Sequence, residues 1–446
     1  MSRKWLLFVP SLLILVAAEP GNQSYFDGKT WWNYVKVLAA DNMEGRETAS
    51  AGLHKAEAYV VSQLQQAGVQ PAGSHGYYQP VKFRTHQIVE EDSSLALISN
   101  SKEEPLTLGN DAYFSTRADL APEVQAELVF AGNGLSVPES NYDDLAGLDL
   151  KNKVAVIVGG APSEIPGPLA AHHSSSAERW NVFRQAGAIG IIYIPNPTAM
   201  DIPWSRISLG RKHVTMMLAD PKFDDSAGEK LSVTFNPASA EKLFAGSGHT
   251  FAEVAALAKE RKPLPHFPLA VSIKAKARLK TSEVESDNIV AKLQGSDPEL
   301  SKQYVVLSAH IDHLGIGEPI NGDRIYNGAM DNASGSAVLL DVAAELKKSR
   351  ERPKRSLLFL FVTAEEKGLL GSRYFAAYPT VSASSIVADI NIDMFMPIVP
   401  LKYLTVWGLD ESSLGDDVRK VTETGGVQVQ NDPEPQRNVF VKRSRT

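Results

Sequence analysis

The sequence YVVLSAHIDHLGIG, residues 304–317, passes from an apolar run into a histidine, an acid and a second histidine. The apolar run at 304–307 predicts a buried strand. His310 and Asp312 then lie at the carboxyl end of that strand. Ionisable side chains at the end of an apolar strand need partners from elsewhere in the chain.

The sequence that follows alternates between the two kinds of secondary structure. A helix is expected at 333–349, a strand in SLLFLFVTA at 356–364, a helix from Leu369, and a strand in SIVADINID at 385–393. Strands that alternate with helices imply right-handed crossovers, so we predict an α/β fold with a mostly parallel sheet flanked by helices. In such sheets, ligands collect beyond the carboxyl ends of the strands.

Further acidic side chains fall at these strand ends or in the loops that leave them. Asp331 lies in NGAMDNASG at the start of the first helix, Glu365 and Glu366 end the second strand, and Asp393 ends the third. Together with His310 they are spaced by about one strand–helix unit, so a parallel sheet brings them to one edge. Each motif alone has an ordinary structural explanation, but their order on successive strands argues against coincidence.

Several carboxylates at one place repel one another unless a cation lies among them. One imidazole with three carboxylates, and no sulfur, suits zinc, with manganese or cobalt as alternatives. The carboxylate of Asp312 can accept the N–H of His310 and hold the ring in the metal-binding tautomer. Only one of Glu365 and Glu366 need bind metal, and the other is then free to act as a general base.

Composition narrows the class of protein. A chain of 446 residues predicts two to three domains. The formal net charge of −7, without a basic stripe, argues against a nucleic-acid partner. The absence of cysteine excludes disulfides, thiol catalysis and thiolate metal ligands.

The amino terminus has the pattern of a targeting segment. Arg3 and Lys4 precede an apolar run at 5–16, and small residues follow at 16–18. Residues 1–18 are therefore predicted to be a signal peptide, with a retained signal anchor as the alternative. The run is short for a membrane span, so no stable span is expected after cleavage. We expect a secreted or periplasmic protein of a bacterial envelope.

The segments SAHIDHLG, NGAMDNASG, FVTAEEKGLLGS and INIDM resemble, in order and spacing, the motifs of the co-catalytic di-zinc aminopeptidases. That family includes bacterial leucyl aminopeptidases, aminopeptidase Y and glutamate carboxypeptidase II. The resemblance implies a zinc-dependent exopeptidase, most simply an aminopeptidase that acts on peptide or protein N-termini. It also implies a cis peptide bond between Asp331 and Asn332.

The resemblance assigns roles to the clustered residues. His310, Asp331 and Glu366 would hold one zinc ion. Asp331 would bridge to a second zinc ion that Asp393 also binds. Glu365 would be the general base.

The middle of the chain resembles the protease-associated domain that many members of this family carry as an insertion. The resemblance rests on AELVFAGNGLSVPESNYDDLAGLDLKNKVAVIVGG and RQAGAIGIIYIPNP. It implies an insertion at 121–268 that divides the peptidase domain into parts at 24–120 and 269–446.

One departure from the family pattern concerns the fifth metal ligand, a histidine well downstream of the last aspartate. No histidine follows His313 in this sequence. We therefore expect a truncated C-terminus and an incomplete second zinc site. Two alternatives stay open: a one-zinc acyltransferase of the glutaminyl cyclase type, and a catalytically impaired peptidase-like binding protein. The sequence leaves the oligomeric state open.

Overall fold

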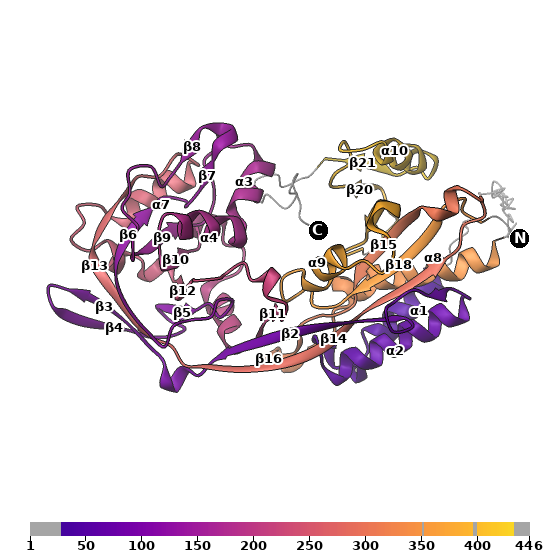
Figure 1. Ribbon diagram of the computed structural model, residues 1–446, viewed down its shortest axis with the longest axis horizontal. Helices are drawn as coiled ribbons and strands as arrows, with labels where there is room; N and C mark the ends of the chain where they lie inside the picture. Colours follow the sequence, from indigo (N-terminus) through magenta and orange to yellow (C-terminus); the bar gives the residue numbers. More distant parts are fainter. Residues whose placement is uncertain (1–27, 350–351, 396–398, 432–446) are drawn as a thin grey trace, which may run out of the picture.

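The computed structural model describes residues 28–349, 352–395 and 399–431. These residues form two lobes, each built on one sheet, joined by a long two-stranded ribbon (Figure 1). The predicted signal peptide at 1–18 lies outside the described residues. No helix in the described ranges is both long and apolar enough to cross a membrane.

The described residues contain the following α-helices, and strands that are grouped here by sheet. The helices are α1 (Gly28–Leu38), α2 (Ala51–Gln66), α3 (Gly167–Ser174), α4 (Ser176–Gln185), α5 (Trp204–Ile207), α6 (Glu241–Phe244), α7 (Phe251–Lys259), α8 (Ser334–Lys348), α9 (Leu370–Ala377) and α10 (Leu414–Thr424). The strands of the first sheet are β1 (Gln70–Pro71), β2 (Tyr78–Ile88), β11 (Thr215–Leu218), β14 (Leu279–Leu293), β15 (Tyr304–His310), β18 (Ser356–Val362) and β19 (Ile386–Asn391). Those of the second sheet are β3 (Ser94–Ser99), β4 (Lys102–Leu106), β5 (Ala112–Phe114), β6 (Glu123–Ala131), β9 (Val154–Val158), β10 (Gly190–Ile194), β12 (Leu231–Phe235) and β13 (His266–Lys276). Small ribbons pair β7 (Ser136–Val137) with β8 (Tyr142–Asp143), β16 (Gly315–Ile320) with β17 (Asp323–Tyr326), and β20 (Tyr403–Thr405) with β21 (Gln428–Gln430).

The first sheet has the order β11-β2-β14-β18-β15-β19. Within it β15 pairs in parallel with β18 and with β19, whereas β14, β2, β11 and β1 pair antiparallel. The predicted α/β class is confirmed. Parallel pairing is found among β15, β18 and β19, the three strands that the alternating sequence pattern predicted. The sheet as described is mixed, because β2 and β14 enter it as an antiparallel ribbon from the other lobe.

Helices cover both faces of the first sheet, and alternation along β18 shows why. Phe359 and Phe361 pack on one face with α1, α2 and α8. Leu358 and Leu360 point to the opposite face, where they meet Phe375 of α9. Successive side chains of a strand point to opposite faces, so a strand buried on both sides is a continuous apolar run.

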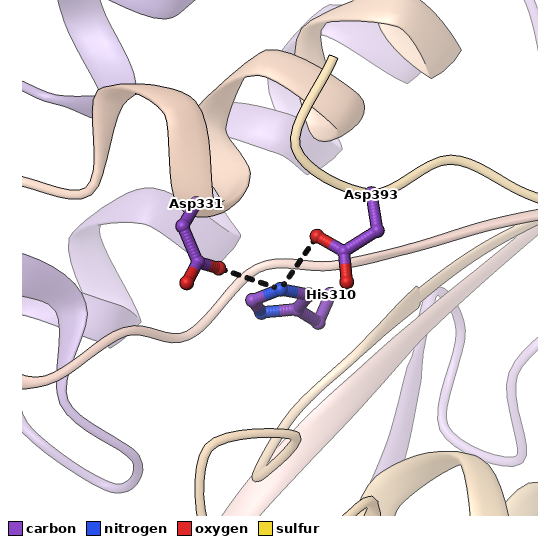
Figure 2. Close-up of side chains that lie close together, drawn as sticks. All are labelled: His310, Asp331 and Asp393. Carbon is purple, nitrogen blue, oxygen red and sulfur yellow. Dashed lines mark ion pairs between the residues drawn. The ribbon is translucent and has the colours of Figure 1, made fainter. Parts of the chain in front are cut away.

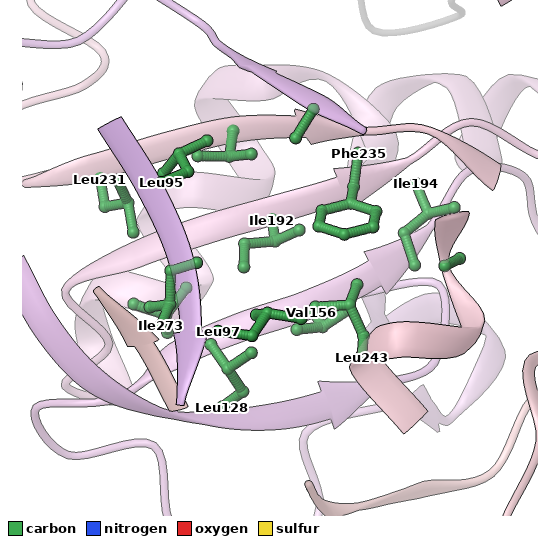
Figure 3. Close-up of a cluster of buried hydrophobic side chains, with 14 of the residues drawn as sticks. Leu95, Leu97, Leu128, Val156, Ile192, Ile194, Leu231, Phe235, Leu243 and Ile273 are labelled. Carbon is green, nitrogen blue, oxygen red and sulfur yellow. The ribbon is translucent and has the colours of Figure 1, made fainter. Parts of the chain in front are cut away.

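The second lobe has its own hydrophobic core (Figure 3). Its central strand β9 is the apolar run VAVIV, and each of its five residues is buried. Val156 faces the core drawn in Figure 3 together with Ile192 and Phe235, whereas Ile157 faces Trp180 and Phe183 of α4. The two lobes therefore bury separate apolar clusters.

The strand pairing cuts across the predicted domain limits. Strands β3 to β5, within the predicted first peptidase part at 24–120, belong to the second sheet. Strand β11, within the predicted insertion at 121–268, pairs with β2 in the first sheet. The division into a protease-associated insertion and a second part at 269–446 stays a prediction. The observed sheets do not follow these limits, because β3 to β5 belong to the second sheet and β11 belongs to the first.

A buried asparagine joins four segments close to the predicted site. Asn288 on β14 is fully buried, and its amide nitrogen donates to Gln79 Oε1 at 3.0 Å and to the Gly371 carbonyl at 2.9 Å. The backbone N–H of Thr363 donates to Asn288 Oδ1 at 3.0 Å. Since Glu365 follows two residues later, Asn288 fixes the backbone from which the glutamate pair leaves β18.

We predict that Asn288→Ala lowers the free energy of unfolding by about 1–3 kcal/mol, because it leaves the buried backbone N–H of Thr363 without its acceptor. Urea denaturation of the two proteins measures the difference. Asn42→Ala is the control, since Asn42 is exposed, and it should change stability by less than about 0.5 kcal/mol. Equal effects of the two substitutions would contradict the role given to Asn288.

Candidate metal centre

The predicted residues converge at one edge of the first sheet. His310 ends β15, Glu365 and Glu366 follow β18, and Asp393 follows β19. Asp331 lies in the short helical turn at 329–333 that precedes α8. Since β18, β15 and β19 are adjacent and parallel, their carboxyl ends meet at the same edge.

The first group of possible ligands is His310 with two aspartates. His310 Nε2 lies 3.0 Å from Asp331 Oδ1 and 3.4 Å from Asp393 Oδ1. Figure 2 shows both carboxylates directed at the imidazole from different segments. His310 is buried, and within the described ranges its Nε2 has no hydrogen-bond partner. A buried ring nitrogen without a partner, faced by two carboxylates, fits a divalent metal ion.

The second group consists of His313, Asp331 and Glu366, whose ligand atoms all lie within 4.8 Å of one another. His313 Nδ1 and Glu366 Oε1 are 2.6 Å apart. Asp331 thus belongs to both groups, in keeping with the bridging position that the resemblance implies. The other partners differ from the expected set, because Glu366 meets His313 whereas His310 meets Asp393.

His313 was not assigned a role from the sequence. The signal that could have found it is the second histidine of HIDH, three residues after His310. The residue lies just beyond β15, where a short bridge to Glu47 holds the chain. This bridge connects the loop to an amino-terminal segment that sequence motifs did not indicate.

The predicted role of Asp312 needs correction. His310 Nδ1 hydrogen-bonds the backbone carbonyl of Asp312 at 3.1 Å, whereas the Asp312 carboxylate lies 3.8 Å from that nitrogen. The carboxylate instead accepts the backbone N–H groups of Glu365 at 3.1 Å and Glu366 at 3.4 Å, and the Thr48 hydroxyl at 3.0 Å. Asp312 therefore orients the His310 ring through its carbonyl and fixes the glutamate pair through its side chain.

Asp331 is held by the residue that follows it. The peptide bond between Asp331 and Asn332 is cis, as the resemblance implies. The buried Asn332 side chain accepts the Gly335 N–H at 2.8 Å and donates to the Ile392 carbonyl at 3.0 Å. Because Ile392 precedes Asp393, this side chain connects the two aspartates of the first group.

Glu365 lies beside the first group without belonging to either group of possible ligands. Its Oε2 is 3.9 Å from His310 Nε2. Burial raises the pKa of the Glu365 carboxyl to about 7, against the effect of the His310 ring and reinforced by the neighbouring carboxylates. A carboxylate with a pKa near neutrality can both accept and return a proton.

His310 and Asp331 shift in opposite directions. Burial alone lowers the pKa of the His310 imidazole, but the carboxylates of Asp331, Asp393 and their neighbours outweigh it and raise the pKa to about 11. The His310 ring holds the pKa of Asp331 below its ordinary value. Without a metal ion, the cluster therefore takes its positive charge from a proton on His310.

Arg46 supports both ligand loops, and no sequence signal pointed to it. Its side chain is 1% exposed, and Nε donates to the Ile311 carbonyl at 2.9 Å. Nη1 donates to Leu38 and Asn327 carbonyls at 2.6 and 2.7 Å, and Nη2 donates to the Gly328 carbonyl at 2.9 Å. One guanidinium thus ties the loop after His310 to the turn before Asp331.

Comparison with known proteins gives one family. Residues 288–444 match the sequence pattern of Peptidase family M28. Carboxypeptidase Q of Xenopus laevis is 30% identical over 118 residues, which are 26% of this chain and 23% of that protein. Leupeptin-inactivating enzyme 1 of Streptomyces exfoliatus is 32% identical over 108 residues, 24% of this chain and 22% of that protein. The matches thus span less than a quarter of these curated relatives.

A solved structure shares the fold over nearly the whole chain. The aminopeptidase from Aneurinibacillus sp. strain AM-1 matches with a TM-score of 0.55 at 18% sequence identity. The match covers 94% of this chain and 84% of that one. The two-lobed arrangement is therefore shared with a known aminopeptidase structure.

We predict that Arg46→Met lowers the free energy of unfolding of the metal-free protein by about 3 kcal/mol, because several buried carbonyls lose their donor at once. Denaturation in urea measures the loss. Arg278→Met, at an exposed position, is the matched control and should have little effect. A change within about 0.5 kcal/mol for Arg46→Met would show that the guanidinium does not hold these loops.

We also predict that zinc binding at pH 7 releases protons and strengthens as pH rises. The raised pKa of His310 keeps a proton on the ring at pH 7, and zinc requires the neutral imidazole. Calorimetric titration in buffers of different ionisation enthalpy counts the protons released. His310→Gln should lose the effect, whereas His249→Gln, at an exposed position, should keep it. A heat of binding that does not depend on the buffer would refute the prediction.

Proposed function

Because the chain belongs to Peptidase family M28, as its motifs predicted, we propose that it is a zinc-dependent exopeptidase that removes the amino-terminal residue of peptides. The observation that carries the proposal is the shared carboxylate of Asp331. It belongs to two groups of ligand-type side chains, with Glu365 beside them and in neither.

The donor set supports zinc. His310, Asp331 and Asp393 would hold one ion, and Asp331, Glu366 and His313 provide donors for a second. All of these donors are nitrogen or oxygen atoms, which zinc accepts. When bound, zinc would lower the pKa of a water molecule and polarise the scissile carbonyl.

Glu365 is proposed as the general base. Its carboxyl, with a pKa of about 7, would take a proton from the attacking water and pass it to the departing amine. The Asp312 carboxylate holds the Glu365 N–H at 3.1 Å, so it would keep the base in position without touching the substrate.

Accessible acids support recognition of a free amino terminus. The side chains of Asp331 and Asp393 are 36% and 38% exposed. They leave the edge of the site open to solvent, so that the end of a peptide can reach the proposed zinc ions. We therefore favour an aminopeptidase, and we place the substrate amine near the ion that these two carboxylates would hold.

We further propose that the protein is exported. The basic residues and apolar run within 1–18 support a signal peptide. The acidic net charge supports a peptide rather than a nucleic-acid substrate.

We predict that Glu365→Gln keeps the zinc content and lowers kcat by roughly 10²–10⁴-fold, because it removes the general base and leaves both ligand groups intact. Glu366→Gln should instead lower the zinc content, and excess zinc should restore part of its activity. Metal analysis after dialysis and release of nitroaniline from leucyl-nitroanilide provide the two measurements.

Glu283→Gln is the control, at an exposed position on β14, and should change neither quantity. If Glu365→Gln strips the metal while Glu366→Gln retains it, the two roles are reversed. If zinc-loaded wild-type protein binds metal yet cleaves no peptide, the chain is a binding protein on a peptidase fold.

A further inference from the structure

The turn that carries the proposed general base has a backbone shape that most residues avoid. It runs from Ala364 to Leu369, and both of these residues have left-handed backbone, with φ of 55° and 60°. The N–H groups of Gly368 and Leu369 donate to the Glu365 carbonyl at 2.8 and 2.9 Å, so the chain reverses directly after the base. Left-handed backbone crowds the Cβ of any residue except glycine, so contacts from outside the turn are needed to hold this shape.

Two contacts from other segments hold the turn. In its first half, the Asp312 carboxylate accepts the N–H groups of Glu365 and Glu366. In its second half, the Lys367 ammonium donates to Glu47 Oε1 at 2.9 Å. The Lys367 side chain is 9% exposed and that of Glu47 is 32% exposed. Water and salt therefore screen this ion pair less than a pair on the open surface.

Glu47 is a fixed anchor for this ion pair. The residue before it, Arg46, accepts the His313 N–H through its backbone carbonyl at 3.0 Å. The residue after it, Thr48, donates its hydroxyl at 3.0 Å to the same aspartate that holds the first half of the turn. Gly315 packs closely against Glu47, because a Cβ placed on that glycine would be 2.6 Å from the Glu47 Cβ. Segment 46–48 thus has little freedom to move.

The same short segment therefore touches each part of the metal centre that lies near it. Arg46 holds the loop of His313, Thr48 holds the aspartate beneath the glutamate pair, and Glu47 holds the residue after that pair. Loss of the Glu47 contact would release only the second half of the turn. The groups of possible metal ligands would keep their other contacts.

We propose that Lys367 is a positioning residue, whose ion pair with Glu47 keeps the turn in the shape that directs the Glu365 carboxylate at the metal centre. The inference rests on the proposed function, in which Glu365 is the base. Because Glu47 balances the charge of Lys367, the pair acts through the position of the turn rather than through a net charge. Lys367 also lines a cavity of about 680 Å³ between the lobes, so the experiment must separate positioning from direct contact with a substrate.

The activity arm uses zinc-saturated protein and leucyl-nitroanilide. Lys367→Met and Glu47→Gln should each lower kcat about 10-fold and change KM by less than about 2-fold, because a misplaced base slows the chemical step without weakening substrate binding. The exchanged pair, Glu47→Lys with Lys367→Glu, should restore most of kcat, because the same two positions are joined again with their charges reversed. The zinc content should match that of the wild type in every variant.

Lys274→Met is the matched control. Lys274 forms a comparable ion pair with Glu103, at 2.8 Å, in the second lobe. Its loss should change neither kcat nor KM. A rise in KM at constant kcat for Lys367→Met would assign Lys367 to substrate binding and overturn the proposal. An exchanged pair that is folded and zinc-loaded, yet no more active than the single variants, would overturn it as well.

The structural arm does not depend on peptidase activity. Amide hydrogen exchange of the metal-free protein, followed by mass spectrometry of peptides that contain residues 365–369, reports on the turn itself. Lys367→Met should speed exchange in these peptides about 3–5-fold, as expected for the loss of one partly shielded ion pair. The exchanged pair should return the rate toward that of the wild type, and Lys274→Met should leave it unchanged.

The two arms together separate the possible failures. Unchanged exchange in Lys367→Met would overturn the proposal, whatever the activity of that variant. Faster exchange with an unchanged kcat would show that the pair holds the turn without positioning the base, which also overturns it. If exchange changes as expected but the zinc-loaded wild type cleaves no peptide, the peptidase function alone is contradicted.

Discussion

The parallel pairing of β15 with both β18 and β19 is the constraint on which the site depends. In this register His310 is opposite Val362, and Ser308 is opposite Asn391. The three strands therefore end together, and the loops leaving them begin within reach of one another. A shift of one residue along any of the strands would turn its side chains to the opposite face and separate the group.

The sequence pattern was sufficient to predict where these strands end and which family the chain resembles. Apolar runs with ionisable residues at their ends are a local signal, and the order of the four motifs is a strong one. The same pattern does not predict which of the clustered side chains contact one another. Glu366 meets His313 rather than His310, because the direction of a side chain depends on the loop that carries it. Sequence spacing does not contain that information.

Supporting residues were the hardest to predict. Arg46 and Asn288 belong to segments far from the motifs. Each forms hydrogen bonds with backbone groups, and because every residue has a backbone carbonyl, such bonds have no sequence pattern. The boundaries between lobes were hidden for a similar reason. Strand β11 pairs with β2 across more than a hundred residues of chain, a contact that has no local pattern. Non-local backbone contacts of this kind require the folded structure.

The ribbon of β2 and β14 has a mechanical consequence. The two strands are paired along their whole length between the lobes, from Leu279 opposite Ile88 to Ile289 opposite Tyr78. Sliding one strand past the other would break this ladder and reverse its side-chain pattern, whereas twisting or bending keeps every pair. Strand β11 fastens the ribbon from its outer edge. Bending of the ribbon would therefore change the angle between the lobes without breaking strand pairs, whereas translation of one lobe along the ribbon would break them.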